Sequence, residues 1–147
     1  MNWKAAAAAV AIAGVAFGVA FAADGTHDSR VGAMKQIGGA AGSLAAIAKG
    51  TKPYDAEAVK TALTTIATTA KAFPDQFQAG PDAADSEASP KIWENMDDFK
   101  ARAMKLSTDA ETAMATLPAD AAAVGEAVKT IGGNCGGCHQ LYRITKN

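Results

Sequence analysis

The stretch Cys135-Gly136-Gly137-Cys138-His139 is the most informative part of the chain. It matches the pattern C-x-x-C-H, which is typical of c-type haem attachment. At this spacing two thiols can add across the two vinyl groups of one porphyrin edge, and the imidazole that follows can bind the iron from one face. The glycines leave room for the macrocycle close to the backbone. The stretch therefore predicts one covalently bound haem c with its iron, held by Cys135 and Cys138 and ligated by His139.

Other uses of the two cysteines are less well supported by the sequence. A zinc site needs four ligands, whereas the chain has two cysteines and two histidines, and His27 lies far from the motif. A thioredoxin-like dithiol accompanies a βαβ pattern, and the sequence shows no strand pattern. A structural disulfide and a haem-free dithiol module remain the alternatives to haem.

The N-terminus has the pattern of an export signal. Lys4 gives a short basic region, residues 5–19 form an apolar run, and Ala20-Phe21-Ala22 is an A-x-A cleavage site. The apolar run is shorter than the ~20 residues that a membrane span needs. We therefore expect residues 1–22 to be a cleaved signal peptide, and residues 23–147 to be one domain that is periplasmic and not stably inserted in a membrane.

Composition narrows the function further. The net charge is −1 and no basic stripe is present, which argues against nucleic-acid binding. The sequence shows no nucleophile–base pair and no phosphate-binding loop, so we do not expect an enzyme.

Four helical segments follow from apolar residues that recur every three or four positions. They span about 28–49 (capped by Asp28 or Ser29), about 56–73 (after the N-cap Asp55), about 90–117 (after Ser89), and from Asp120 through the motif. A long connection covers 74–89. Four such segments predict an all-α fold, an antiparallel up-and-down four-helix bundle with one covalently bound haem.

Glycines interrupt two of these segments. Gly38, Gly39 and Gly42 each disfavour a helix by roughly 1 kcal/mol relative to alanine. A haem plane or another helix packed closely against them would explain them. Gly132-Gly133 precedes the motif, and if the last helix continues through it, Cys135 and His139 lie one turn apart on one face.

Several stretches together resemble the class II c-type cytochromes, which comprise cytochrome c′ and cytochrome c-556. They are Cys135-Gly136-Gly137-Cys138-His139-Gln140-Leu141-Tyr142-Arg143, Ile92-Trp93-Glu94-Asn95-Met96-Asp97-Asp98-Phe99, Pro53-Tyr54-Asp55 and Arg30-Val31-Gly32-Ala33-Met34-Lys35. The resemblance covers essentially the whole chain after residue 22. It implies that Cys135 and Cys138 form the thioethers and that His139 is the proximal ligand. It also implies that Arg143 lies near the proximal face, that Arg30 approaches a propionate and that Met34 faces the distal side.

Met34 divides two functions within this family. A methionine bound to the iron gives a six-coordinate centre, and its soft thioether raises the reduction potential. We predict this ligand, and hence a one-electron carrier that serves periplasmic redox proteins. The alternative is a five-coordinate, cytochrome c′-like binder of nitric oxide or carbon monoxide, with Met34 only lining the pocket. The family also includes homodimers formed through the first two helices, and the sequence is compatible with one.

The remaining candidates have simpler interpretations. Arg30 pairs with a propionate or faces solvent on its helix. We expect His27 and Lys129 to be solvated and Trp93 to lie in the core or an interface. Tyr142 shares the face of His139, and Asp97-Asp98 is interpreted as a solvated face, not as a general acid–base pair.

Overall fold

The computed structural model describes residues 25–77 and 87–145. Its helices are α1 (His27–Ala48), α2 (Ala56–Ala72), the 3-10 helix η1 (Phe73–Phe77), α3 (Lys91–Glu94), α4 (Met96–Ala115) and α5 (Ala121–Tyr142). The predicted signal peptide and most of the long connection lie outside the described residues. No helix in the described part is long and apolar enough to cross a membrane.

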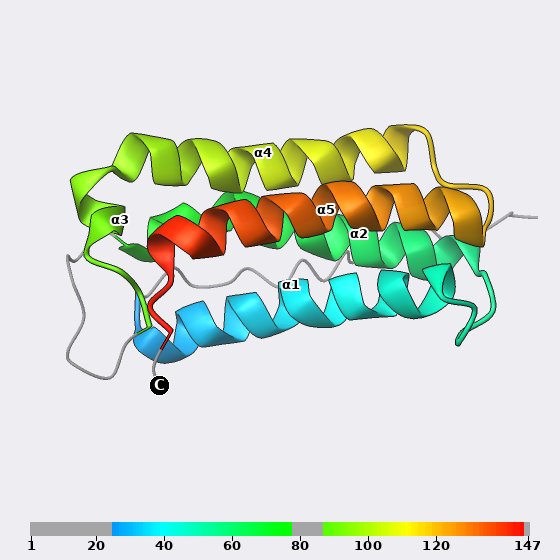
Figure 1. Cartoon of the computed structure of the whole chain (residues 1–147), viewed down its shortest axis with the longest axis horizontal. Helices are drawn as coiled ribbons and strands as arrows, with labels where there is room; N and C mark the ends of the chain where they lie inside the picture. Colours follow the sequence, from blue (N-terminus) through cyan, green and yellow to red (C-terminus); the bar gives the residue numbers. More distant parts are fainter. Residues whose placement is uncertain (1–24, 78–86, 146–147) are drawn as a thin grey trace, which may run out of the picture.

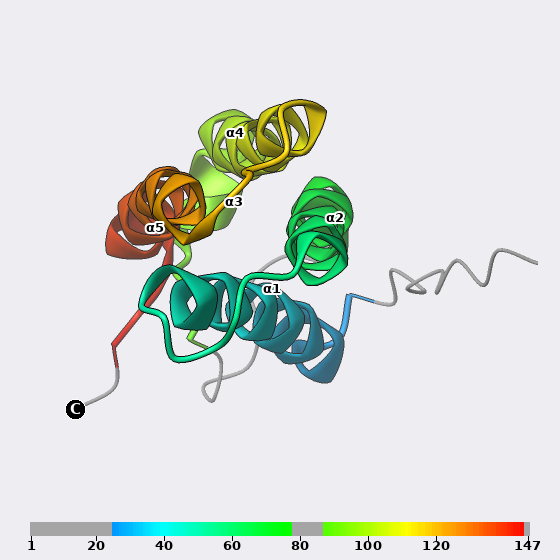
Figure 2. The same cartoon turned by 90° about the vertical axis from the view of Figure 1, so that its right-hand side faces the viewer.

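The four long helices form the predicted antiparallel up-and-down bundle (Figure 1). Viewed along the bundle, α4 and α1 lie opposite each other, with α5 and α2 on either side (Figure 2). Each of the four long helices packs against the next long helix along the chain, and α5 also packs against α1. This arrangement confirms the all-α four-helix bundle, in which the C-terminal end of α5 and the N-terminal end of α1 lie at the same end of the bundle (Figure 1).

The helix boundaries follow from local hydrogen bonds. Asp55 Oδ1 accepts the Ala58 N–H at 2.7 Å, and Asp120 Oδ1 accepts the Ala123 N–H at 2.8 Å, so both predicted N-caps are confirmed. The cap of α1 is Thr26, whose hydroxyl accepts the backbone N–H of Ser29, instead of Asp28 or Ser29. Gly50 follows α1 with a φ of +71°, a left-handed conformation that suits glycine.

The predicted single helix over 90–117 is wrong, because Asn95 divides it into α3 and α4. Asn95 has φ −134° and ψ 48°, which is not helical, and its side-chain amide donates to the Lys91 carbonyl at 3.4 Å. Asparagine is prone to such a break because its side chain competes with the helical backbone for hydrogen bonds. The break lets Ile92, which is buried, pack into the end of the bundle.

Two separate groups of buried residues form the core. The central cluster joins the four long helices, and its larger members are Ile37, Leu44, Ile47, Val59, Leu63, Ile66, Leu106, Val124 and Ile131. The aromatic cluster contains Phe77, Ile92, Phe99 and Tyr142, with Phe73 and Trp93 packed against it. Since Tyr142 ends α5 and Phe99 lies in the first turn of α4, the aromatic cluster lies at the end of the bundle where α5 finishes.

Aromatic contacts hold this second cluster together. The centroid of the Phe99 ring lies 4.9 Å from that of Phe77 and 5.3 Å from that of Tyr142, and both pairs have edge-to-face geometry. Trp93 Nε1 donates to the Phe77 carbonyl at 2.8 Å. Trp93 is therefore part of the core, as the sequence indicated.

Candidate haem-attachment site

Helix α5 continues without a break through Gly132-Gly133 and through the motif to Tyr142. Cys135 and His139 therefore lie one helical turn apart, and Cys138 lies three residues after Cys135. A continuous helix fixes these three side chains relative to one another through a single backbone element.

The two thiols contact different parts of the core. Cys135 packs against the central cluster, whereas Cys138 packs against the aromatic cluster. Both are free and half-buried. Burial raises the pKa of each thiol, so both are protonated at neutral pH. The motif thus lies at the boundary between the two clusters, with both sulfur atoms on the inner side of α5.

His139 is exposed on α5. Its partial desolvation, followed by the nearby Arg143 cation, lowers the pKa of the imidazole. The ring is therefore neutral at neutral pH, which is the form that binds metal ions. Within residues 25–77 and 87–145, no group of three or more histidine, cysteine or acidic side chains is placed to hold a metal ion.

An apolar cavity of about 270 Å³ lies between α1 and α5, next to Cys135. Its lining is small and apolar: Ala41, Gly42, Leu44, Ala45, Val128, Ile131, Gly132 and Cys135. A Cβ atom placed on Gly42 or Gly132 would meet no atom within 4 Å. Free thiols, an adjacent imidazole and an apolar cavity bordered by glycines fit the attachment of a flat, apolar macrocycle to α5.

The predicted close neighbour of the α1 glycines is not another helix of this chain. Among the described residues, no atom outside the local helix lies within 4 Å of a Cβ built on Gly38, Gly39 or Gly42. Packing by another described helix of this chain therefore does not explain these glycines, and a haem plane or a helix of a second copy stays a prediction.

Met34 is half-buried on α1 and packs against the central cluster, the same cluster that Cys135 contacts. The fold therefore brings the candidate distal ligand and the first attachment cysteine to one group of side chains, although they are about 100 residues apart in the sequence. A cofactor attached at Cys135 would share this apolar environment with Met34.

The two arginines of the predicted site have different surroundings. Arg30 is 6 % exposed, and its guanidinium lies 4.8 Å above the Phe77 ring. The alternative in which Arg30 faces solvent is therefore wrong. Arg143 is exposed. Its Nε and Nη2 atoms lie 2.8 Å and 2.7 Å from Oε2 of Glu87, and its backbone forms an antiparallel bridge with Ala88.

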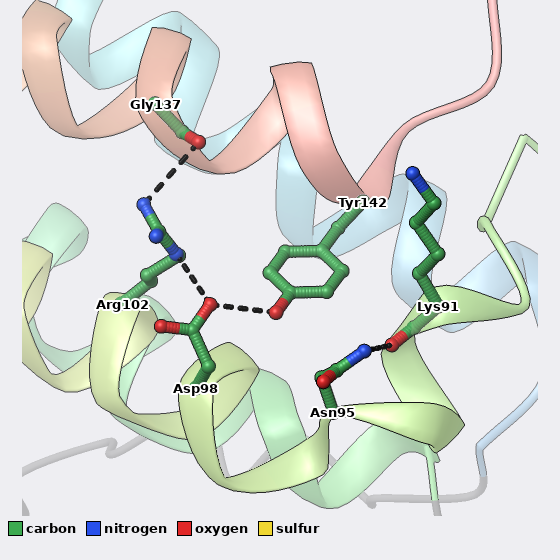
Figure 3. Close-up of polar contacts among 6 residues, drawn as sticks. All are labelled: Lys91, Asn95, Asp98, Arg102, Gly137 and Tyr142. Atoms are coloured by element: carbon green, nitrogen blue, oxygen red, sulfur yellow. Dashed lines mark hydrogen bonds and ion pairs between the residues drawn. The ribbon is translucent and has the colours of Figure 1, made fainter.

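The sequence missed a polar contact between α4 and the motif. Asp98 is exposed, as the predicted solvated face requires, and its Oδ2 also accepts hydrogen bonds from the Tyr142 hydroxyl at 2.6 Å and from Arg102 Nε at 2.7 Å (Figure 3). Arg102 Nη1 also donates to the Gly137 carbonyl at 3.4 Å. The hydrogen bond from Arg102, followed by that from Tyr142, lowers the pKa of Asp98. The i,i+4 spacing of Asp98 and Arg102 was the available sequence signal for their pairing.

A second missed contact precedes the motif. Asp109 Oδ2 accepts the Asn134 side-chain amide at 2.7 Å and also binds Lys105 at 2.6 Å. No sequence spacing relates Asp109 to Asn134, because they lie on different helices.

Two residues that the sequence places at the surface do lie there. His27 is exposed, and Lys129 pairs with Glu126 on an exposed face of α5.

Comparison with known proteins agrees with this geometry. The family model described as Cytochrome C' matches residues 26–143. Cytochrome c-556 from Agrobacterium tumefaciens (strain apple 185) is 69 % identical over 123 residues, covering 84 % of this chain and 98 % of that protein. Cytochrome c-556 from Agrobacterium fabrum is 55 % identical over 146 residues, covering 99 % of each.

Solved structures show the same fold. Cytochrome c′ from Rhodopseudomonas palustris has a TM-score of 0.75 and 33 % identity, covering 82 % of this chain and 96 % of that one. Oxidised cytochrome c556 from Rhodopseudomonas palustris has a TM-score of 0.74 and 31 % identity, with coverage of 82 % and 97 %. The chain therefore belongs to the cytochrome c′ family, the class II c-type cytochromes, and binds a covalent haem c with its iron.

Proposed function

We propose that the protein is a periplasmic one-electron carrier. Cys135 and Cys138 hold the haem, His139 is the proximal ligand and Met34 is the distal ligand. The observation that carries the proposal is that Met34 packs on the same cluster as Cys135. The relatives named cytochrome c-556, at 69 % and 55 % identity, support it.

The bound haem supplies an Fe(III)/Fe(II) couple that takes up and releases one electron. The chain's own residues keep that couple in a fixed environment. The two thiols anchor the group to a continuous helix, and the neutral His139 presents a nitrogen lone pair on one side. Met34 presents a soft thioether from α1, and the cavity beside Cys135 is lined by apolar side chains; soft axial ligation favours a raised reduction potential.

The alternative is a five-coordinate protein that binds nitric oxide or carbon monoxide, with Met34 only lining the distal pocket. The similarity to the cytochrome c′ of Rhodopseudomonas palustris, at 33 % identity, favours it. In both cases the protein is a haem protein with no proposed catalytic residue, since its relatives are cytochromes.

A visible and near-infrared spectrum of the purified holoprotein separates these functions, with Met34→Ala as the decisive variant. We expect a low-spin ferric spectrum with a sulfur-to-iron charge-transfer band that disappears in Met34→Ala. Met104→Ala is the matched control, because Met104 is 41 % exposed on α4 and its loss should leave the band unchanged. A high-spin spectrum insensitive to Met34→Ala would refute the carrier proposal and favour gas binding.

The compartment and the assembly state are proposed on the same basis. Residues 1–22 are proposed to be removed on export, so the intact mass of the periplasmic protein should correspond to a chain that starts at Ala23. A mass that includes residues 1–22 would contradict cleavage. The open face of α1 is compatible with a homodimer through α1 and α2, and sedimentation equilibrium distinguishes a dimer from a monomer.

A further inference from the structure

The part of α5 that carries the motif is weakly held by apolar packing. The buried side chains of α5 are Val124, Ile131 and Tyr142. Between Ile131 and Tyr142, where the motif lies, no side chain of α5 is fully buried. Four glycines fall in residues 132–137, and each disfavours the helical conformation by roughly 1 kcal/mol relative to alanine. Contacts with α4 therefore add to the packing of Cys135 and Cys138, and to the covalent haem, in keeping this stretch helical and in place.

Polar side chains of α4 supply such contacts on both sides of the motif. Before Cys135, Asn134 donates to Asp109. After it, Tyr142 donates to Asp98, so the end of α5 is tied to the first turns of α4 (Figure 3). These two hydrogen bonds involve residues on either side of the motif and none within it.

Arg102 reaches the motif itself. Its guanidinium donates from Nε to Asp98 at 2.7 Å and from Nη1 to the carbonyl of Gly137 at 3.4 Å. Gly137 is the residue before Cys138, and a Cβ placed on it would lie 3.7 Å from Nη1. Arg102 is thus the α4 side chain that joins the Asp98–Tyr142 pair to the backbone between the two cysteines.

We propose that Arg102 is a positioning residue for the haem-attachment segment. It holds the turn Gly137–His139 at a fixed distance from α4, and so fixes the orientation of the Cys138 and His139 side chains relative to the bundle. The proposal rests on haem attachment and His139 ligation at this motif, but not on ligation by Met34. It assigns Asp98 the role of fixing the guanidinium through Nε while Nη1 is directed at α5.

The two-directional contact requires arginine. A planar guanidinium donates along several fixed directions at once, whereas a lysine ammonium is a point charge on a flexible stem. Arg102→Lys should keep the i,i+4 pairing with Asp98, and with it the local charge, but lose the bond to Gly137. This variant therefore separates the effect of position from the effect of charge.

The test compares holoprotein variants Arg102→Lys and Arg102→Met with the control Lys129→Met. Lys129 pairs with Glu126 on the exposed side of α5. The control therefore removes one cation from α5 itself and leaves the contacts between α4 and α5 unchanged. The readouts are the reduction potential, the ferric spectrum and hydrogen exchange of the amides in residues 134–142, relative to residues 121–131.

We expect Arg102→Lys to shift the potential and the spectrum in the same direction as Arg102→Met. Exchange in residues 134–142 should rise about tenfold, the factor that corresponds to the loss of one such hydrogen bond. Lys129→Met should leave all three readouts unchanged. A wild-type potential, spectrum and exchange in Arg102→Lys would overturn the proposal, as would an equal change in Lys129→Met. The exchange readout does not depend on the sixth iron ligand, so failure of the Met34 proposal remains distinguishable.

Discussion

Replacing Gly39 by alanine should stabilise the protein. Gly39 lies inside α1 with helical backbone angles, and a Cβ built on it meets no atom within 4 Å. Alanine therefore adds helix propensity without a clash, and the expected gain in the free energy of unfolding is about 0.8–1 kcal/mol. For a domain of this size, that gain corresponds to a rise in Tm of roughly 3–6 °C.

Gly50→Ala is the matched control, because its Cβ also meets no atom within 4 Å but its φ is +71°. A left-handed backbone disfavours alanine by about 1–2 kcal/mol, so this variant should be less stable than the wild type. Urea unfolding followed by far-UV circular dichroism measures both changes on the holoprotein. A loss of stability in Gly39→Ala would refute the reasoning, since it would mean that a second copy or the haem presses on this face of α1.

Two further predictions follow from side chains at the core and at the α4–α5 contact. Phe99→Ala should lower the free energy of unfolding by about 3–5 kcal/mol, because the ring is 2 % exposed and packs edge-to-face on two others; a loss below about 1 kcal/mol in urea unfolding would contradict this. Asp109 has its pKa lowered from 3.8, first by the hydrogen bond from Lys105, so its carboxylate contributes stability that is lost as the pH falls below 3.8. The wild type should therefore lose stability more steeply than Asp109→Asn in this acid range, and parallel pH profiles of urea unfolding would disprove the assignment.

The helices were largely predictable, because their signals are local. Asp55 and Asp120 cap α2 and α5 as the sequence indicated, and the apolar periodicity identified the buried faces. The break at Asn95 was not found, because apolar residues on either side keep the helical spacing and hide a change in backbone direction. A single residue with a competing side-chain hydrogen bond is too weak a signal against such a pattern.

The sequence predicted the residues of the candidate haem-attachment site, but it did not predict the contacts between α4 and α5 on either side of that site. The spacing of the cysteines and the histidine is contained in five consecutive residues, and the family resemblance added Met34 and Arg30. The contacts of Asp98 with Tyr142 and of Asp109 with Asn134 join different helices. Such contacts depend on how α4 and α5 are rotated about their axes, which no local spacing in the sequence specifies.

The division of the core into two clusters has a consequence for cooperativity. Cys135 belongs to the central cluster and Cys138 to the aromatic cluster, so the attachment motif is a junction between them. A macrocycle bonded to both sulfur atoms would lie against side chains of both clusters, so that opening of the aromatic cluster alone would also expose part of the apolar macrocycle. We therefore expect the two clusters to unfold together when the haem is bound. The cofactor would then determine how much of the protein unfolds in one cooperative step, in addition to supplying the redox chemistry.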